Sequence, residues 1–404
     1  MTGLRSWRRL AGRAAFTAGA YVTAAAVVVL TFFALKGRVD ARTLQALLGY
    51  FFIASMAAGL EPGTIKAAAL KHQGLAVDVR AAMTASVIKG LAASPILAVV
   101  WRFADPHIDV ALLIWTPGLC VAGFAATDLR VLFDLEGRHA TAIWIKQGAL
   151  AAGLAIVAAL VWLRAPLATG IAVSTLARLA FVAAVVVARG ARGHVAATPF
   201  FARLSGLFAE RRWIDLAAAS LVAAISGSTD RVFGLRYLTP EAWAGYYLLY
   251  EVFSKFWFVP YLLAPIVFAR RLAEGPGARF PREARRLTAA AGALFALAVA
   301  GVAAAATFLP VPGPPLALGL PALALAAAVV TSSFTQLRVA QCQGAGASRR
   351  VLAAMSVSAV LAAALFYAGA RGFGAPGLMI AWLIKSALEL AIITLAARWP
   401  PRVA

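Results

Sequence analysis

Charged residues are scarce in this sequence, and their scarcity excludes an ordinary soluble domain. Only 13% of the 404 residues are Asp, Glu, Lys or Arg, whereas 62% are hydrophobic. The mean hydropathy is +0.84, while soluble domains carry about 25% charged residues. Apolar stretches of roughly 20 residues, the length that crosses a hydrocarbon core, recur from end to end. We therefore expect an all-α polytopic membrane protein.

Cysteine, histidine and long polar connections are also rare. Cys120 and Cys342 fall in or beside apolar stretches, which favours small packing residues over a disulfide framework. The four histidines are scattered without ligand spacing, so no metal site is predicted. The longest polar connection, 189–212, is too short to form an extramembrane domain.

The apolar stretches and the turn signals between them predict about 12 transmembrane helices. The first stretch follows four arginines, as in a signal peptide, but its length and the lack of a cleavage site indicate a retained helix. The predicted ranges are 14–35, 43–66, 82–103, 109–129, 141–163, 166–188, 213–236, 242–268, 286–309, 315–338, 350–369 and 374–397.

Positive charge alternates between the two sides of these helices. With the N-terminus inside, the inside connections and termini hold 25 Lys and Arg, including Arg130 and Lys146, and the outside loops hold seven. Positively charged loops stay in the cytoplasm, so the chain is predicted to be N-in and C-in. The net charge of +22 then reflects topology and does not call for nucleic acid.

A short internal repeat predicts two halves. "LKGRVDARTLQALLGYFF" begins at Leu35, and "LRYLTPEAWAGYYLLYEVF" begins at Leu235, where the same predicted helix pair recurs. The second copy is offset from the first by six predicted helices. Because six is an even number, both halves insert in the same orientation, as in parallel transporter repeats. We expect two six-helix lobes, at 1–200 and 201–404.

Several bases lie within the predicted helices. Such residues usually face a bundle interior or a water-filled cavity, because an ionised group is costly in hydrocarbon. Glu251 lies four residues before Lys255, and Glu389 lies four residues after Lys385, so each acid shares a helix face with its base. These two bases could form ion pairs with the acids or bind a ligand. Lys89 and Arg178 have no acid within reach along their own helices. These two favour binding of an anionic group such as a phosphate or diphosphate. The candidate binding residues are Lys89, Arg178, Lys255 and Lys385.

A second set of charged residues is predicted to act in gating or coupling. Asp230 and Arg231 lie toward the outer end of the predicted helix 213–236, where they could pair across the lobe interface when an outward gate is shut. Asp230, Glu251 and Glu389 are also acids that could titrate during transport.

Two stretches resemble the Wzx-type polysaccharide flippases of the MOP (MATE-like) exporter superfamily. One begins at Ser228 and reads "STDRVFGLRYLTPEAWAGYYLLYEVFSKFWFVPYLLAPIVFARRLAEG". The other begins at Leu48 and reads "LGYFFIASMAAGLEPGTIKAAAL", similar to the family's second helix. The resemblance in architecture covers essentially the whole chain, although its motifs are degenerate.

This resemblance implies a transporter and not an enzyme. It would flip undecaprenyl-diphosphate-linked oligosaccharide to the periplasmic leaflet of the bacterial inner membrane by alternating access, for O-antigen, capsule or exopolysaccharide export. The family's cationic cavity corresponds by helix position to Arg178, Lys255, Lys385 and Lys89. No cofactor or nucleic acid is expected. A glycan polymerase and export machinery are expected partners. Coupling to a proton gradient, a sodium gradient or the membrane potential stays open.

Three alternatives are weighed against this interpretation. A cation-coupled MATE-type small-molecule exporter shares the fold but usually carries an acid in its first helix, and 14–35 contains none. Peptidoglycan-precursor flippases typically have two further helices. A membrane-embedded glycan polymerase or ligase would have a long outside loop with catalytic residues, whereas every predicted outside loop is short.

Overall fold

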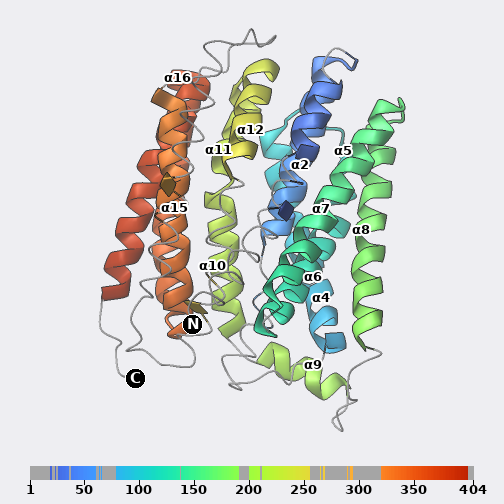
Figure 1. The fold of residues 1–404 in the computed structure, drawn as a ribbon, viewed down its shortest axis with the longest axis vertical. Coiled ribbons are helices and arrows are strands. Elements are labelled where there is room, and N and C mark those ends of the chain that lie inside the picture. Colours follow the sequence, from blue (N-terminus) through green and yellow to red (C-terminus); the bar gives the residue numbers. More distant parts are fainter. Residues whose placement is uncertain are drawn as a thin grey trace, which may run out of the picture. The chain divides into compact units, whose positions relative to one another are not determined.

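The fold is described by a computed structural model for residues 19–20, 23, 26–35, 38–60, 63, 65, 79–136, 138–190, 200–209, 212–254, 264, 267–268, 289, 292–293 and 320–398. The main elements of this part of the chain are helices (Figure 1). They are α2 (Ala41–Gly59), α4 (Val79–Ala104), α5 (Val110–Leu113), α6 (Thr116–Leu135), α7 (His139–Trp162), α8 (Leu167–Gly190), α9 (Phe200–Ala209), α10 (Arg212–Ser226), α11 (Thr229–Tyr237), α12 (Pro240–Ser254), α15 (Leu320–Gly344) and α16 (Ser348–Arg398).

The described residues group into two compact units. The N-terminal unit lies within Val22–Ala224, and the C-terminal unit lies within Ile225–Ala404 together with Met1–Tyr21. The first contains α2 to α9 and nearly all of α10, and the second contains α11, α12, α15 and α16. The predicted lobe boundary at residue 200 stays a prediction.

Six helical segments of the described part are long and apolar enough to cross a membrane. They are Val79–Ala104, Val110–Leu135, Thr141–Trp162, Leu167–Ala188, Leu323–Gly344 and Ser348–Ala396. At 26 residues, α4 is about 39 Å long, more than the ~30 Å hydrocarbon core. The expectation of a helical multi-pass membrane protein is confirmed. The count of twelve helices stays a prediction, because 286–309 and the second half of 242–268 lie mostly outside the described residues.

Three predicted helices have different limits in the structure. The helix predicted at 43–66 ends at Gly59, because the following Glu61-Pro62 step disfavours helical backbone. The helix predicted at 109–129 is divided into α5 and α6, and α6 continues to Leu135. An ion pair between Arg130 and Asp134, 3.3 Å apart, lies along this extra turn.

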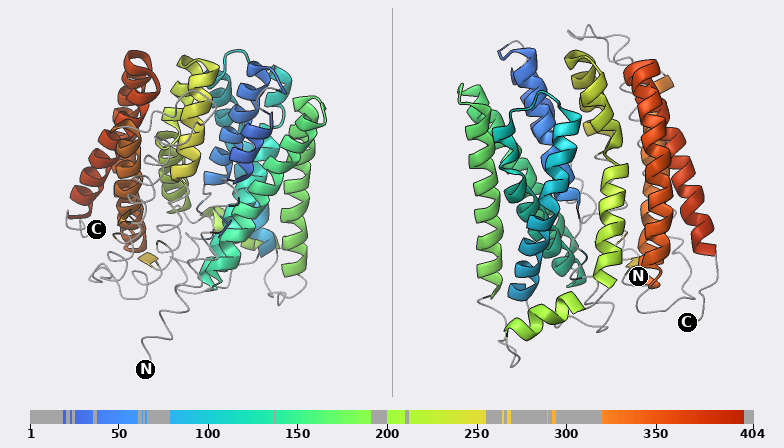
Figure 2. Two further views of the ribbon diagram at one scale, coloured as in Figure 1. Left: turned by 45° about the horizontal axis from the view of Figure 1, so that its top comes forward. Right: turned by 180° about the vertical axis from the view of Figure 1, so that it is seen from behind.

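The third difference is a break in the helix predicted at 213–236. Backbone turns at Gly227 and Ser228 separate α10 from α11. Within the connection predicted at 189–212, the structure also contains the short helix α9, which lies across the ends of longer helices of its unit (Figures 1 and 2).

Aromatic side chains form much of the buried interior of each unit. In the N-terminal unit, Tyr50, Phe51 and Phe52 of α2 are fully buried. In the C-terminal unit, rings of α12 pack against those of α16, with the Tyr250 and Trp382 centroids 5.8 Å apart. In the C-terminal unit, Glu251 of α12 and Lys385 of α16 are buried as well.

Candidate functional site

Arg178 lies at the middle of α8 and is enclosed by helices of the N-terminal unit. It is only 4% exposed. Tyr50 of α2 hydrogen-bonds with the guanidinium, and the Tyr50 hydroxyl is 3.1 Å from Oγ of Ser174, one turn earlier in α8. A Cβ atom on Gly153 of α7 would lie 2.7 Å from Cδ of Arg178. The bare backbone of α7 therefore packs against the arginine stem.

The charge of Arg178 has no acidic partner among the described residues. The neighbour that stabilises its charged form is the Tyr50 phenol. Within the same part of the chain, Nε and Nη1 of Arg178 lack hydrogen-bond partners. Leaving a buried ion unpaired is unfavourable by several kcal/mol. This arrangement is suited to an anion that would supply the missing charge.

Lys89 of α4 is buried against aromatic rings at another place in the same unit. Its Nζ lies 3.7 Å from the ring centroid of Trp213 and 5.3 Å from that of Phe208. Asp128 of α6 attracts the ammonium, and this carboxylate accepts a hydrogen bond from the Ser86 hydroxyl. The fold thus supplies Lys89 with an acid from a different helix.

Asp128 and Lys146 are buried ionisable residues that the sequence prediction missed. Asp128 stood at the end of the predicted helix 109–129, and Lys146 was counted with the inside connections. In the structure Asp128 is 1% exposed within α6, and Lys146 is 7% exposed within α7. The available signal was that apolar residues continue on both sides of each.

Lys385 and Glu389 form the ion pair that their spacing predicts. Nζ of Lys385 and Oε2 of Glu389 are 2.5 Å apart on α16, and both side chains are buried. The ammonium also lies 4.9 Å from the ring centroid of Trp382. The formal charges of this pair cancel, so Lys385 attracts an anion less strongly than an unpaired base would.

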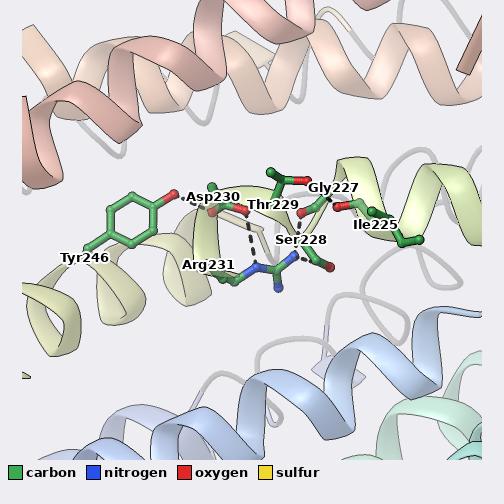
Figure 3. Close-up of polar contacts among 7 residues, drawn as sticks. All are labelled: Ile225, Gly227, Ser228, Thr229, Asp230, Arg231 and Tyr246. Atoms are coloured by element: carbon green, nitrogen blue, oxygen red, sulfur yellow. Dashed lines mark hydrogen bonds and ion pairs between the residues drawn. The ribbon is translucent and has the colours of Figure 1, made fainter. Parts of the chain in front are cut away.

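Arg231 bridges the break between α10 and α11 (Figure 3). Its Nη2 donates to the Gly227 carbonyl at 2.5 Å and to Oγ of Ser228 at 3.2 Å. The Thr229 hydroxyl donates to the Ile225 carbonyl at 2.7 Å. Helix ends leave carbonyls without helical partners, and these side chains satisfy the carbonyls at the end of α10.

Asp230 is fully buried in the first turn of α11 and has partners within its own unit. It accepts a hydrogen bond from the Tyr246 hydroxyl of α12, and its Oδ1 is 3.5 Å from Nε of Arg231 (Figure 3). A helix N-terminus favours a carboxylate. Arg231 in turn lies 4.3 Å from the Tyr250 ring centroid. Both residues therefore stabilise the broken helix, and their predicted role in a gate between lobes stays a prediction.

The remaining predicted residues are Glu251 and Lys255. Glu251 of α12 is 2% exposed and lies within electrostatic reach of Arg231. Lys255 is outside the described residues, so the predicted pair of Glu251 with Lys255 stays a prediction. The structure brings Asp230, Arg231 and Glu251 together, whereas Lys89 and Arg178 have different neighbours.

Possible metal ligands and the two cysteines are dispersed in the described part of the chain. No group of three or more His, Cys, Asp and Glu side chains in this part of the chain could hold a metal ion. Cys120 and Cys342 are both buried free cysteines, and their packing role stays a prediction.

Comparisons with known proteins show the fold. The sequence matches no protein-family model and no curated protein. An outward-facing multidrug resistance MATE family transporter of the MOP superfamily is similar at a TM-score of 0.59 and 15% identity, over 96% of this chain and 94% of that chain. A eukaryotic MATE transporter, AtDTX14, is similar at a TM-score of 0.56 and 15% identity, over 96% and 95%. The chain is a multi-pass membrane protein with a MATE-like fold.

Proposed function

We propose that this protein flips undecaprenyl-diphosphate-linked oligosaccharide from the cytoplasmic to the periplasmic leaflet of a bacterial inner membrane. The MATE-like fold supports a transporter. The observation that carries the anionic substrate is a set of three buried bases, Lys89, Arg178 and Lys385, each no more than 7% exposed in apolar helices. Of these, Arg178 has no acidic partner among the described residues. Anionic oxygens of a diphosphate are natural ligands for such groups.

In this proposal the charged residues have two roles. Lys89, Arg178, Lys255 and Lys385 bind the diphosphate. Asp230, Arg231, Glu251 and Glu389 take part in gating or coupling, driven by a proton or sodium gradient or by the membrane potential. A glycan polymerase and export machinery would receive the product, which would serve O-antigen, capsule or exopolysaccharide synthesis.

A cation-coupled small-molecule exporter is the second candidate. The buried acid Asp128, close to Lys89 in the N-terminal unit, favours it, because a carboxylate inside a membrane protein can bind a proton or a cation. Residues 26–35, the described part of the predicted first helix, contain no acid, which disfavours the coupling site expected for that class.

Deletion of the gene distinguishes the two candidates. The flippase predicts that lipid-linked glycan accumulates on the cytoplasmic leaflet, measured by its resistance to an impermeant glycan-modifying enzyme in intact spheroplasts. Complementation by Arg178→Met, which removes the base that has no acidic partner among the described residues, should restore no more than about a tenth of wild-type export, because transport depends exponentially on lost binding energy. Arg349→Gln, which changes an exposed base, should restore it fully. Normal glycan distribution together with new sensitivity to cationic dyes would instead identify the small-molecule exporter.

A further inference from the structure

The guanidinium of Arg178 is buried and only partly hydrogen-bonded. Two of the three guanidinium nitrogens, Nε and Nη1, lack hydrogen-bond partners in the described part of the chain, although the residue is 4% exposed. Most buried side-chain donors in proteins are satisfied, so the vacant ones point to a ligand.

The neighbours of Arg178 are neutral polar groups that complement a negative charge. Tyr50 hydrogen-bonds with the guanidinium, and its hydroxyl is 3.1 Å from Oγ of Ser174. Hydroxyl groups can turn their hydrogen atoms toward an anion. A base beside two hydroxyls, with no carboxylate next to it in the described part of the chain, is a donor set that suits phosphate oxygens and halides.

The packing around the guanidinium limits the size of the ligand. Gly153 of α7 contacts the arginine stem, where a Cβ would lie 2.7 Å from Cδ. The ring centroid of Tyr50 is in turn 6.3 Å from that of Trp101, which is 1% exposed. This close packing favours one small anionic group over a bulky ligand.

We propose that Arg178, with Tyr50 and Ser174, forms an occluded binding site for a single small anionic group in the interior of the N-terminal unit. The ligand chemistry is that of a phosphate oxygen or a halide. Two sources can supply it, the diphosphate of a polyprenyl lipid or a free inorganic anion. The first source rests on the proposed function, whereas the second does not.

Thermal unfolding of the purified full chain in detergent tests this site. The ligands are sodium chloride, sodium phosphate, and farnesyl diphosphate with farnesol as its uncharged control. Sodium gluconate keeps the ionic strength constant. Binding to the folded state raises the unfolding temperature in a saturable way, and we expect a rise on the order of 3 °C for at least one anion. The rise should vanish in Arg178→Met.

Two variants with smaller changes test the site even if Arg178→Met does not fold. Tyr50→Phe and Ser174→Ala each remove one hydroxyl and should weaken the apparent affinity by roughly tenfold, as expected for a lost hydrogen bond to a charged group. Tyr246→Phe is the matched control, because it removes a buried phenol hydroxyl from the other unit, and it should keep the full anion-dependent rise.

Each outcome of the unfolding experiment either supports the anion site at Arg178 or overturns it. Stabilisation by farnesyl diphosphate alone places the lipid diphosphate at Arg178, while stabilisation by chloride or phosphate identifies an inorganic anion. The proposal would be overturned if no anion raised the unfolding temperature of the wild type, or if the rise were equal in Arg178→Met. The assay contains no glycan and measures no export, so loss of the flippase assignment would leave its result intact.

Discussion

At the scale of single residues, two of the buried charges are balanced by groups from other helices. Asp230 is bound by Tyr246 of α12, and Lys89 is attracted by Asp128 of α6. Spacing along one helix predicted the pair of Lys385 with Glu389. It could not predict the partners of Asp230 and Lys89, because these depend on how the helices pack.

Removal of the Tyr246 hydroxyl should destabilise the protein. Tyr246→Phe leaves the fully buried Asp230 carboxylate without its phenol donor, which should lower the free energy of unfolding by about 1–3 kcal/mol. Chemical unfolding in detergent measures this loss. Tyr237→Phe, at a residue that is 40% exposed, should change stability little. Equal stability of the two variants would show that the hydrogen bond to Asp230 contributes nothing.

A methyl group at Gly153 should displace Arg178. The added Cβ would lie 2.7 Å from Cδ of Arg178 and 2.9 Å from Oγ of Ser174, and overpacking of this kind costs about 1–3 kcal/mol. Gly148→Ala, one to two turns earlier in α7, is the control, because its Cβ meets only Trp144 at 3.5 Å. Gly153→Ala should therefore be less stable than Gly148→Ala and should lose anion-dependent stabilisation. Similar unfolding of both would contradict the close packing of α7 on α8.

At the scale of elements, apolar length predicted the helices well where no backbone signal interrupts them. The ranges 141–163 and 166–188 correspond closely to α7 and α8. The break at Gly227 and Ser228 was missed because a single helix, 213–236, was predicted through the polar residues that surround it. The side chains that satisfy the freed carbonyls, Arg231 and Thr229, come from the following helix. The polar "STDR" stretch was the available signal of this break.

Gly374 separates the two helical segments of α16 and should not accept a side chain. Its φ of 65° and ψ of −143° belong to a region that is essentially restricted to glycine, where other residues are strained by about 1–3 kcal/mol. Gly374→Ala should be destabilised by that amount in chemical unfolding. Gly372→Ala, whose Cβ would meet no atom within 4 Å, is the matched control. Equal stability would mean that the two segments are not joined through this backbone conformation.

Asp40 begins α2 and makes its first turn sensitive to pH. Its carboxylate accepts hydrogen bonds from the Thr43 hydroxyl at 2.7 Å and the Thr43 backbone N–H at 2.8 Å. These bonds lower the pKa of Asp40 from its ordinary value. A lowered pKa means that the stabilisation is present at neutral pH and is lost as the carboxylate is protonated in acid.

Hydrogen exchange at residues 41–44 measures the contribution of Asp40. Asp40→Ala should speed exchange in this turn at pH 7, as loss of an N-cap destabilises a helix by about 1 kcal/mol. Asp40→Asn keeps a capping oxygen and should protect the turn without the acid-dependent loss. Unchanged exchange in Asp40→Ala would show that α2 does not depend on this cap.

At the scale of the whole molecule, the distribution of positive charge predicts how the chain is threaded through the membrane. Arg138 precedes α7 and Arg164 follows it, so a helix that crosses once must place them on opposite sides. The excess of Lys and Arg in alternate connections predicts that Arg138 lies in the cytoplasm and Arg164 outside. This orientation underlies the direction of the proposed transport, from the cytoplasmic leaflet outward.

Labelling of single new cysteines tests this orientation directly. Cys120 is fully buried and Cys342 is 8% exposed, so the wild-type chain should react little with a membrane-impermeant maleimide. Arg164→Cys should be labelled in spheroplasts, whereas Arg138→Cys should be labelled only after the membrane is permeabilised. Labelling of Arg138→Cys alone in intact spheroplasts would invert α7. The arginine-rich connections would then lie outside, and the proposed export direction would lose its topological basis.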